Sequence, residues 1–177
     1  MAVASEYAGD VVKLGDDINT DVIFPGRYIL VMEPEEMRKH VLEGLGEDYA
    51  RRIKPGDFIV AGRNFGCGSS REQAAGCLKA AGVAAVIAGS FARIFYRNAV
   101  NTGLLVLACP EAVDAIADGD KIAVRPKEGR VTLCDGRTFR FPPIPDFLME
   151  IIEAGGLVEH GRKVIAARKA ALQEQQR

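Results

Sequence analysis

Short apolar runs alternate with helix-length amphipathic stretches through the middle of the chain. The run Phe58–Ala61 precedes a predicted helix at 70–81, and a second apolar run at 83–88 precedes a predicted helix at 91–101. A third run follows at 104–107. Continuous apolar runs of this length are typical of parallel strands that are buried on both faces. The order strand–helix–strand–helix–strand therefore predicts an α/β core.

The pattern changes on both sides of this core. The elements predicted there are a first strand at 11–14, a helix at 33–42, a β-hairpin made of 121–124 and 130–133, and a helix at 146–154. From about residue 157 the sequence is charged and predicts a further helix. We expect a single domain over residues 1–177, with a C-terminal helical extension from about 157.

Composition narrows the classes of function. The chain has 177 residues, 48% of them hydrophobic, and a net charge of −1, which gives no electrostatic reason to bind nucleic acid or an anionic membrane. No apolar run approaches the roughly 18 residues of a spanning helix, and Met1–Glu6 lacks the basic and apolar regions of a secretion signal. We expect a cytoplasmic protein whose partners include neither nucleic acid nor a membrane.

Cysteine spacing gives no sign of a metal site. Cys67, Cys77, Cys109 and Cys134 include no Cys-x-x-Cys pair, and the two histidines are distant in sequence. We expect no metal ligands on this chain and reduced, mostly buried thiols. Because Cys67 lies inside a glycine-rich loop, a reactive nucleophile or redox switch there stays open as an alternative.

The segment 62–73, Gly-Arg-Asn-Phe-Gly-Cys-Gly-Ser-Ser-Arg-Glu-Gln, carries the densest candidate chemistry. Its glycines allow sharp turns and a close approach of backbone to a ligand. Ser69 with Glu72, and Ser70 with Gln73, have the spacing of a capping box at a helix start. Free N–H groups, two hydroxyls and a guanidinium predict a site for a carboxylate or another anion. Helix capping alone is the alternative.

The next strand should bring more polar groups to the same edge. The carboxyl ends of parallel strands meet at one edge of a sheet, so we expect Ser90 and Arg93 near the glycine loop. In the alternative interpretation, Arg93 and Arg97 are solvated or paired with acidic residues and play no part in the site. The loop is not a P-loop, a dinucleotide fingerprint or a nucleophile elbow, because the lysine, third glycine and Gly-x-Ser-x-Gly pattern are missing.

Four motifs together carry a family resemblance. They are Gly-Asp-Asp-Ile-Asn-Thr-Asp at 15–21, Asn-Phe-Gly-Cys-Gly-Ser-Ser-Arg-Glu at 64–72, Ser-Phe-Ala-Arg-Ile-Phe-Tyr-Arg-Asn at 90–98, and Ile-Ile-Glu-Ala-Gly-Gly-Leu at 151–157. This set resembles the aconitase superfamily, and within it the separate small subunits of 3-isopropylmalate dehydratases. The resemblance covers essentially the whole chain. It implies the swivelling domain of that superfamily, a β/β/α layered α/β fold with a partly parallel central sheet.

The resemblance also implies an activity and a partner. The family reaction is a dehydration and rehydration, here of 2-isopropylmalate and 3-isopropylmalate in leucine biosynthesis. It implies a large subunit with a [4Fe-4S] cluster, in which cysteines hold three irons and the fourth iron binds the substrate. No cofactor is then expected on this chain, which would act on a di- or tricarboxylate only within a heterodimer or heterotetramer.

Site residues follow from the same resemblance. Ser69 matches the general base that removes the carbon-bound proton, and Ser70 and Arg71 match the binders of a substrate carboxylate. Gly68 and Cys67 complete the binding loop. An ordinary serine is a very weak acid, so nearby positive charge and N–H donors must stabilise its deprotonated form.

Two other segments bear on the substrate. Aconitase has an arginine just before its equivalent of the loop at 15–21, where this chain has Leu14, so Arg27 is a candidate substitute. The segment matching the substrate-specificity loop consists of Tyr28, Ile29, Leu30, Val31 and Met32. Its apolar side chains favour an isopropyl group over a further carboxylate.

Several alternatives stay open. The loop at 28–32 is a plain core strand in one of them. In a second alternative, the chain serves a related dehydratase whose substrate is homoaconitate, citraconate or methylmalate, or dimethylmalate. In a third, the chain is a carboxylate-binding regulatory module without catalysis.

Overall fold

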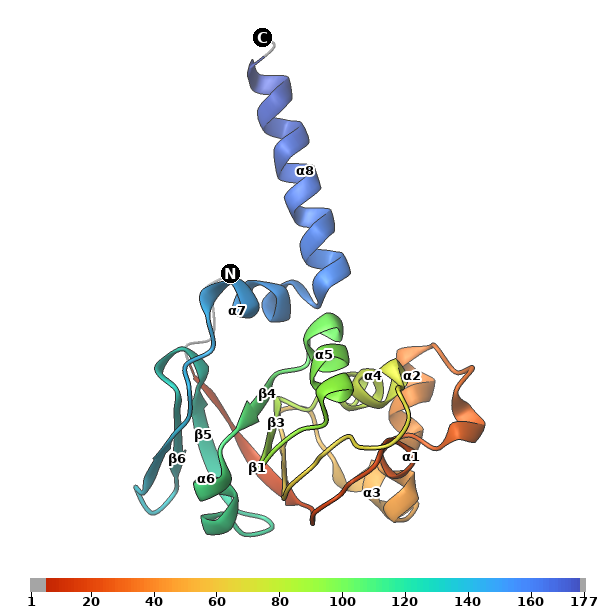
Figure 1. The fold of residues 1–177 in the computed structure, drawn as a ribbon, viewed down its shortest axis with the longest axis vertical. Helices are drawn as coiled ribbons and strands as arrows, with labels where there is room; N and C mark the ends of the chain where they lie inside the picture. Colours follow the sequence, from red (N-terminus) through yellow and green to blue (C-terminus); the bar gives the residue numbers. More distant parts are fainter. Residues whose placement is uncertain (1–5, 176–177) are drawn as a thin grey trace.

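A seven-stranded sheet organises the computed structural model, which describes residues 6–175 (Figure 1). The strands are β1 (Tyr7–Lys13), β2 (Phe58–Ala61), β3 (Ala85–Ala88), β4 (Val106–Ala108), β5 (Lys121–Arg125), β6 (Arg130–Leu133) and β7 (Thr138–Arg140). Their order is β4-β3-β2-β1-β5-β6-β7. The pairs from β4 to β1 are parallel, and the pairs from β1 to β7 are antiparallel. The sheet is therefore partly parallel, as the sequence predicts.

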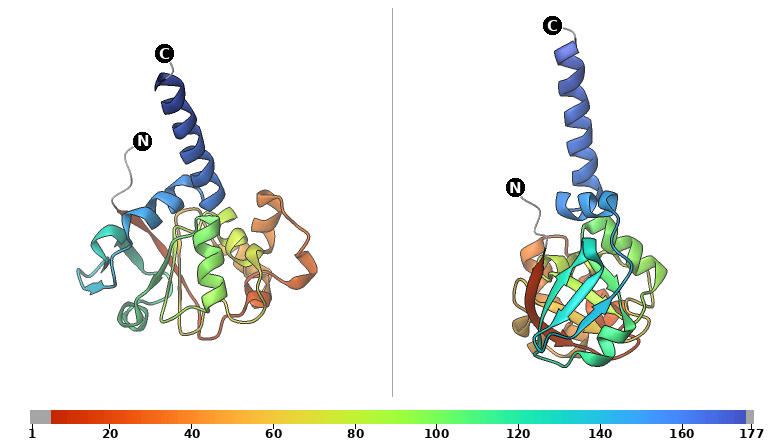
Figure 2. Two further views of the ribbon diagram at one scale, coloured as in Figure 1. Left: turned by 45° about the horizontal axis from the view of Figure 1, so that its top comes forward. Right: turned by 90° about the vertical axis from the view of Figure 1, so that its left-hand side faces the viewer.

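Helices of 4 to 19 residues accompany the sheet. They are α1 (Thr20–Ile23), α2 (Pro34–Met37), α3 (Asp48–Arg52), α4 (Glu72–Ala80), α5 (Arg93–Thr102), α6 (Pro110–Ala115), α7 (Asp146–Ala154) and α8 (Leu157–Gln175). Short 3₁₀ segments occur at Gly26–Tyr28, Arg38–His40, Glu43–Leu45 and Pro126–Glu128. Helix α8 projects away from the body of the molecule (Figures 1 and 2).

Side chains of the parallel strands alternate between two hydrophobic cores. In β2, Ile59 and Ala61 pack with α4 and α5 on one face, whereas Phe58 and Val60 pack on the other face. This second core includes Val124 and other residues of the antiparallel half, so the curled sheet encloses it from two sides. The molecule is thus layered as β/β/α, and its fold class agrees with the prediction.

The predicted alternation β2-α4-β3-α5-β4 is present. Gly82 and Gly103 follow α4 and α5 with φ angles of +80° and +78°, a conformation that glycine adopts without the cost of a β-carbon clash. The predicted hairpin is β5 and β6, and Gly155 ends α7. These elements form where apolar runs and glycine stops agree.

Other predicted elements differ from the structure. The helix predicted at 33–42 is a short α2 followed by a 3₁₀ turn, because Val41 and Leu42 turn inward as buried residues. Helix α6 and strand β7 were not predicted. The segment 28–32 is a turn in which Ile29, Leu30 and Met32 are exposed, so its interpretation as a core strand is wrong.

Candidate active site

The glycine loop lies between two other loops at the carboxyl edge of the parallel strands. Gly66 donates its backbone N–H to the Ile18 carbonyl at 2.7 Å, and Thr20 donates to the Cys67 carbonyl at 2.8 Å. On the other side, Phe65 donates to the Ser90 carbonyl at 3.0 Å. The loops after β1, β2 and β3 therefore hold one another in place.

Gly66 is required for this arrangement. Its φ angle is +77°, and a β-carbon there would lie 2.1 Å from the Phe95 ring. Asn64 also has a positive φ, +59°, and its side-chain amide donates to Asp17 at 2.8 Å. Close packing of the loop on α5 fixes the direction in which the next residues leave it.

Ser69 and Ser70 are exposed and unengaged. Within residues 6–175, no hydrogen bond is recorded to either hydroxyl or to the backbone N–H groups of Ser69, Ser70 and Arg71. Helix α4 begins at Glu72 with Arg71 as its N-cap, which makes no side-chain capping bond. The two predicted capping boxes are therefore wrong, and both hydroxyls are available to a ligand.

Arg71 is positioned by the loop that follows β1. Its Nη1 donates to the Asp21 carboxylate at 2.5 Å and to the Phe24 carbonyl at 3.2 Å. Its side chain is only 12% exposed, whereas Asp21 is largely exposed. The hydrogen bond from Arg71 holds the pKa of the Asp21 carboxyl below its ordinary value, so this ion pair persists at neutral pH.

The backbone beside Ser69 is held by α1. The Thr20 hydroxyl donates to the Ser69 carbonyl at 3.0 Å, and the Asn19 side chain caps α1 by accepting from the Val22 N–H at 2.8 Å. Gly68 has a φ of +92° and is exposed. Thr20 and Asp21 thus support the loop, although sequence reasoning gave neither a role; their place in the motif at 15–21 was the available signal.

Cys67 is a structural member of the loop. Its Sγ atom donates to the Asp17 carbonyl at 3.6 Å, and its backbone forms a bridge with Asn19. The thiol is half-buried and forms no disulfide. The predicted binding role of Cys67 and its alternative role as a nucleophile both stay predictions.

The predicted specificity loop lies next to the start of α4. Gln73 donates from Nε2 to the Ile29 carbonyl at 3.0 Å. Leu30 is 90% exposed and Met32 is 70% exposed, whereas Tyr28 and Val31 are half-buried. Two large apolar side chains therefore project from a loop that is tied to the helix following Ser69 and Ser70.

The Ser90 side chain binds the glycine loop and does not cap α5. Its hydroxyl accepts from the Asn64 N–H at 2.9 Å, while Ala92 is the N-cap of α5.

Arg93 lines a shallow pocket of about 340 Å³ together with Ser90 and Arg97. No carboxylate in the described part of the chain pairs with Arg93 or Arg97, which excludes the paired alternative there. Arg27 instead pairs with Glu43.

Residues 6–175 contain neither a metal-binding cluster nor a membrane-spanning helix. No group of three or more His, Cys, Asp or Glu side chains there is arranged to hold a metal ion. None of the helices in that range has both the length and the apolarity to cross a membrane.

Comparison with known proteins identifies the family. The Aconitase C-terminal domain model matches residues 36–112. The 3-isopropylmalate dehydratase small subunit 1 of Methanopyrus kandleri is 56% identical over 146 residues, which is 82% of this chain and 86% of that protein. The corresponding subunit of Archaeoglobus fulgidus is 53% identical over 157 residues, 88% of this chain and 97% of that protein.

The chain belongs to the family of 3-isopropylmalate dehydratase small subunits. A crystal structure of the 3-isopropylmalate dehydratase of Methanocaldococcus jannaschii superposes with a TM-score of 0.84 and 42% identity. The superposition covers 93% of this chain and 99% of the chain in that crystal structure. Both the family resemblance and the aconitase-type fold predicted from the sequence are confirmed.

Proposed function

We propose that this chain is the small subunit of a two-chain hydro-lyase that interconverts 2-isopropylmalate and 3-isopropylmalate in leucine biosynthesis. The observation that carries the proposal is local. Ser69 and Ser70 present unengaged hydroxyls, and Arg71 is locked beside them by Asp21. The near-complete coverage of relatives that bear this name supports the same activity.

Ser69 is the proposed general base. It takes the carbon-bound proton of the substrate during dehydration and returns a proton during rehydration. Its deprotonated oxygen needs positive electrostatic potential, which the Arg71 guanidinium and the N-terminal end of the nine-residue helix α4 supply. The unengaged N–H groups of residues 69–71 are further donors for an anionic oxygen.

Arg71 and Ser70 are the proposed binders of one substrate carboxylate. Asp21 and Phe24 occupy only Nη1 of Arg71, and no described residue bonds to its Nη2 or Nε. Those atoms retain the planar geometry that suits a carboxylate. Gly68 and Cys67 shape the floor of the same loop, and Arg93 on the neighbouring loop is a candidate for the second carboxylate.

The other half of the site is proposed to lie on a large subunit. A [4Fe-4S] cluster there would act as a Lewis acid on the substrate hydroxyl. Residues of this chain move the carbon-bound proton, hold a carboxylate and cover the substrate. We infer that activity requires both chains, as a heterodimer or heterotetramer.

The loop at 28–32 is proposed to meet the substrate's side chain. Leu30 and Met32 expose apolar surface that would be buried against an isopropyl group when the two chains close. The same surface disfavours a substrate with an additional carboxylate, as in homoaconitate. Methyl- and dimethyl-substituted malates would fit but fill the pocket less well.

The proposal extends to the whole chain and its compartment. We propose that residues 1–177 act as a single swivel-type domain with α8 as its extension. A cytoplasmic setting fits the four cysteines, all of them free thiols.

Reconstitution tests the proposal. The isolated chain should show no turnover, and the chain mixed with the cluster-bearing large subunit should convert isopropylmalate with a higher kcat/KM than methylmalate, dimethylmalate or homoaconitate. No turnover of isopropylmalate, together with carboxylate binding by the isolated chain in calorimetry, would favour the regulatory module instead.

A further inference from the structure

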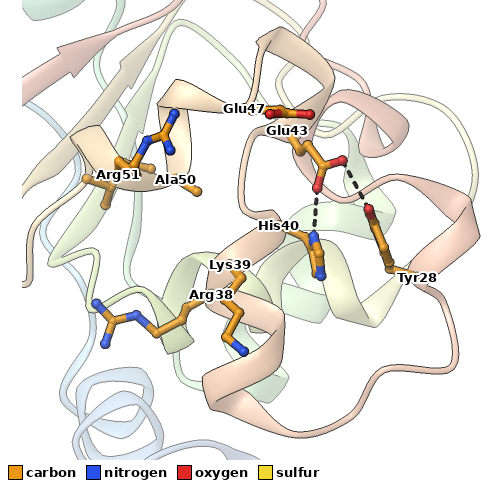
Figure 3. A pocket seen from close by; sticks show the side chains of 9 residues that line it. Tyr28, Arg38, Lys39, His40, Glu43, Glu47, Ala50 and Arg51 are labelled. Carbon is orange, nitrogen blue, oxygen red and sulfur yellow. Dashed lines mark hydrogen bonds and ion pairs between the residues drawn. The ribbon is translucent and has the colours of Figure 1, made fainter.

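The carboxylate of Glu43 joins three side chains at the base of the specificity loop. It accepts hydrogen bonds from Arg27 and, at 3.1 Å, from the Tyr28 hydroxyl. Its second oxygen lies 2.6 Å from Nδ1 of His40. Figure 3 shows Glu43 between His40 and Tyr28 at the side of a pocket of about 530 Å³. Glu43 thus connects Arg27 and Tyr28, at the start of the specificity loop, with His40 at the end of the 3₁₀ segment Arg38–His40.

Stacking adds to these hydrogen bonds. The Tyr28 and His40 rings are parallel within 15°, with centroids 3.6 Å apart. The Arg27 guanidinium lies over the Tyr28 ring, with its Cζ atom 4.8 Å from the ring centroid. Tyr28 is therefore fixed by its ring as well as by its hydroxyl.

Glu43 itself stands on a rigid support. Its side chain is only 11% exposed, and the preceding Leu42 is fully buried with a φ of +56°. Leu42 donates its N–H to the Ile23 carbonyl at the end of α1, at 2.8 Å. Gly44 packs so closely that a β-carbon there would lie 2.4 Å from Val22. The backbone on both sides of Glu43 is thus held against α1, the helix that also supports Ser69 and Arg71.

The far side of the loop has its own support. Gln73 donates to the Ile29 carbonyl and, at 3.8 Å, to the Met32 sulfur, so it contacts the chain on both sides of the exposed Leu30. The position of Leu30 relative to Ser69 therefore depends on two anchors, one at Glu43 and one at Gln73. Among the described residues, the Glu43 carboxylate bonds to Arg27, Tyr28 and His40 and to none of the proposed binding residues Ser69, Ser70 and Arg71.

We propose that Glu43 is a positioning residue for substrate discrimination, which acts by holding Arg27 and Tyr28 and thereby fixing the apolar loop over the substrate's side chain. The inference rests on the proposed function. A pocket for one or two methyl groups discriminates by about 10- to 200-fold only when its walls keep their place. A loop released at Tyr28 would adapt to smaller side chains and lose that ratio.

Glu43→Gln tests this in the reconstituted two-chain enzyme. The amide keeps the size of the side chain but loses its charge and one acceptor. We expect KM for isopropylmalate to rise about tenfold with kcat within about twofold, and the kcat/KM preference for isopropylmalate over methylmalate to fall at least fivefold. Tyr28→Phe, which removes only the hydroxyl that Glu43 accepts, should shift the preference in the same direction and is informative if the Glu43 variant folds poorly.

Glu47→Gln is the matched control, because Glu47 lines the same pocket and no hydrogen bond or ion pair joins it to Arg27 or Tyr28. It should leave KM and preference unchanged. An unchanged preference in folded Glu43→Gln or Tyr28→Phe enzyme would overturn the inference while leaving the proposed function intact. Wild-type enzyme that fails to convert isopropylmalate would instead contradict the proposed function.

Discussion

Arg71 donates to the carboxylate of Asp21 at 2.5 Å, across 50 positions of sequence. This ion pair joins the loop after β1 to the segment that carries Ser69 and Ser70. A guanidinium that is mostly buried and paired on one nitrogen keeps a fixed orientation, which a carboxylate clamp requires. Asp21 is thus a supporting residue for the proposed substrate-binding group.

Asp21→Asn should weaken substrate binding more than chemistry. The amide leaves Arg71 without its charged partner, so its guanidinium samples more orientations. We expect KM to rise about tenfold, equivalent to about 1.4 kcal/mol, with kcat reduced less than threefold in steady-state kinetics of the reconstituted enzyme. Asp48→Asn, which removes an exposed ion pair with Arg51 on α3, is the control. Equal KM values for the two variants would refute the role of Asp21.

Gly66→Ala should destabilise the fold strongly. Alanine would have to adopt the positive φ of Gly66, and its β-carbon would displace the Phe95 ring. Overpacking of this kind costs about 1–3 kcal/mol, and the backbone strain adds to that cost. Gly15→Ala is the matched control, because a β-carbon there meets no atom within 4 Å. Denaturant unfolding should show a lower midpoint for Gly66→Ala only. Similar midpoints for the two variants would show that the loop at Gly66 has room for a β-carbon beside Phe95.

The sequence predicts the parallel half of the sheet well because its signals are redundant. In β2 and β3, continuous apolar runs coincide with glycine stops and helix-length spacing. Strand β7 lacks such a signal, since Thr138 and Arg140 are exposed residues at the sheet edge. Helix α6 is only six residues long and begins with Pro110, too short for a clear period.

The candidate site is predicted only in part. Ser69 and Arg71 are neighbours in sequence, so their association needs no tertiary information. The capping predicted for Ser69 and Ser70 fails because α4 begins later, with Arg71 as its extended N-cap at φ −135°, and Thr20 holds the Ser69 carbonyl. The supports at Asp21 and Glu43 come from folding of distant segments and have no local signature.

Acid should destabilise the protein through Asp118 among other carboxylates. The Lys13 backbone N–H, donating at 2.8 Å, holds the pKa of Asp118 below its ordinary value, and Arg52 adds to the effect. A lowered folded-state pKa stabilises the fold above the unfolded pKa of about 3.9, and that contribution is lost as pH falls through the folded value. Asp118→Asn lacks this acid-sensitive contribution, so its Tm should decrease less between pH 6 and about pH 3 than the Tm of the wild-type protein. Because the Asp118 side chain is half exposed, the difference should be only about 1–2 °C. Identical pH profiles would contradict this assignment.

Cysteine reactivity should follow burial. Desolvation raises the pKa of the Cys77 thiol strongly, and burial also raises that of Cys109, so neither forms much reactive thiolate at pH 8. Iodoacetamide labelling of the native chain, read by mass spectrometry, should modify exposed Cys134 first and Cys67 more slowly. Rapid labelling of Cys77 would show that the core opens. Unchanged reconstituted activity after labelling of Cys67, with Cys134→Ser as background, would dismiss its alternative role as a nucleophile.

The central claim is that Ser69 is the base of a site completed by a second chain. Its most direct test is the turnover of isopropylmalate by the large subunit reconstituted with Ser69→Ala. Loss of a general base predicts a kcat at least about 10³-fold lower, with complex formation and substrate binding preserved. Turnover within about tenfold of wild type, in a complex of normal affinity, would contradict the assignment of Ser69.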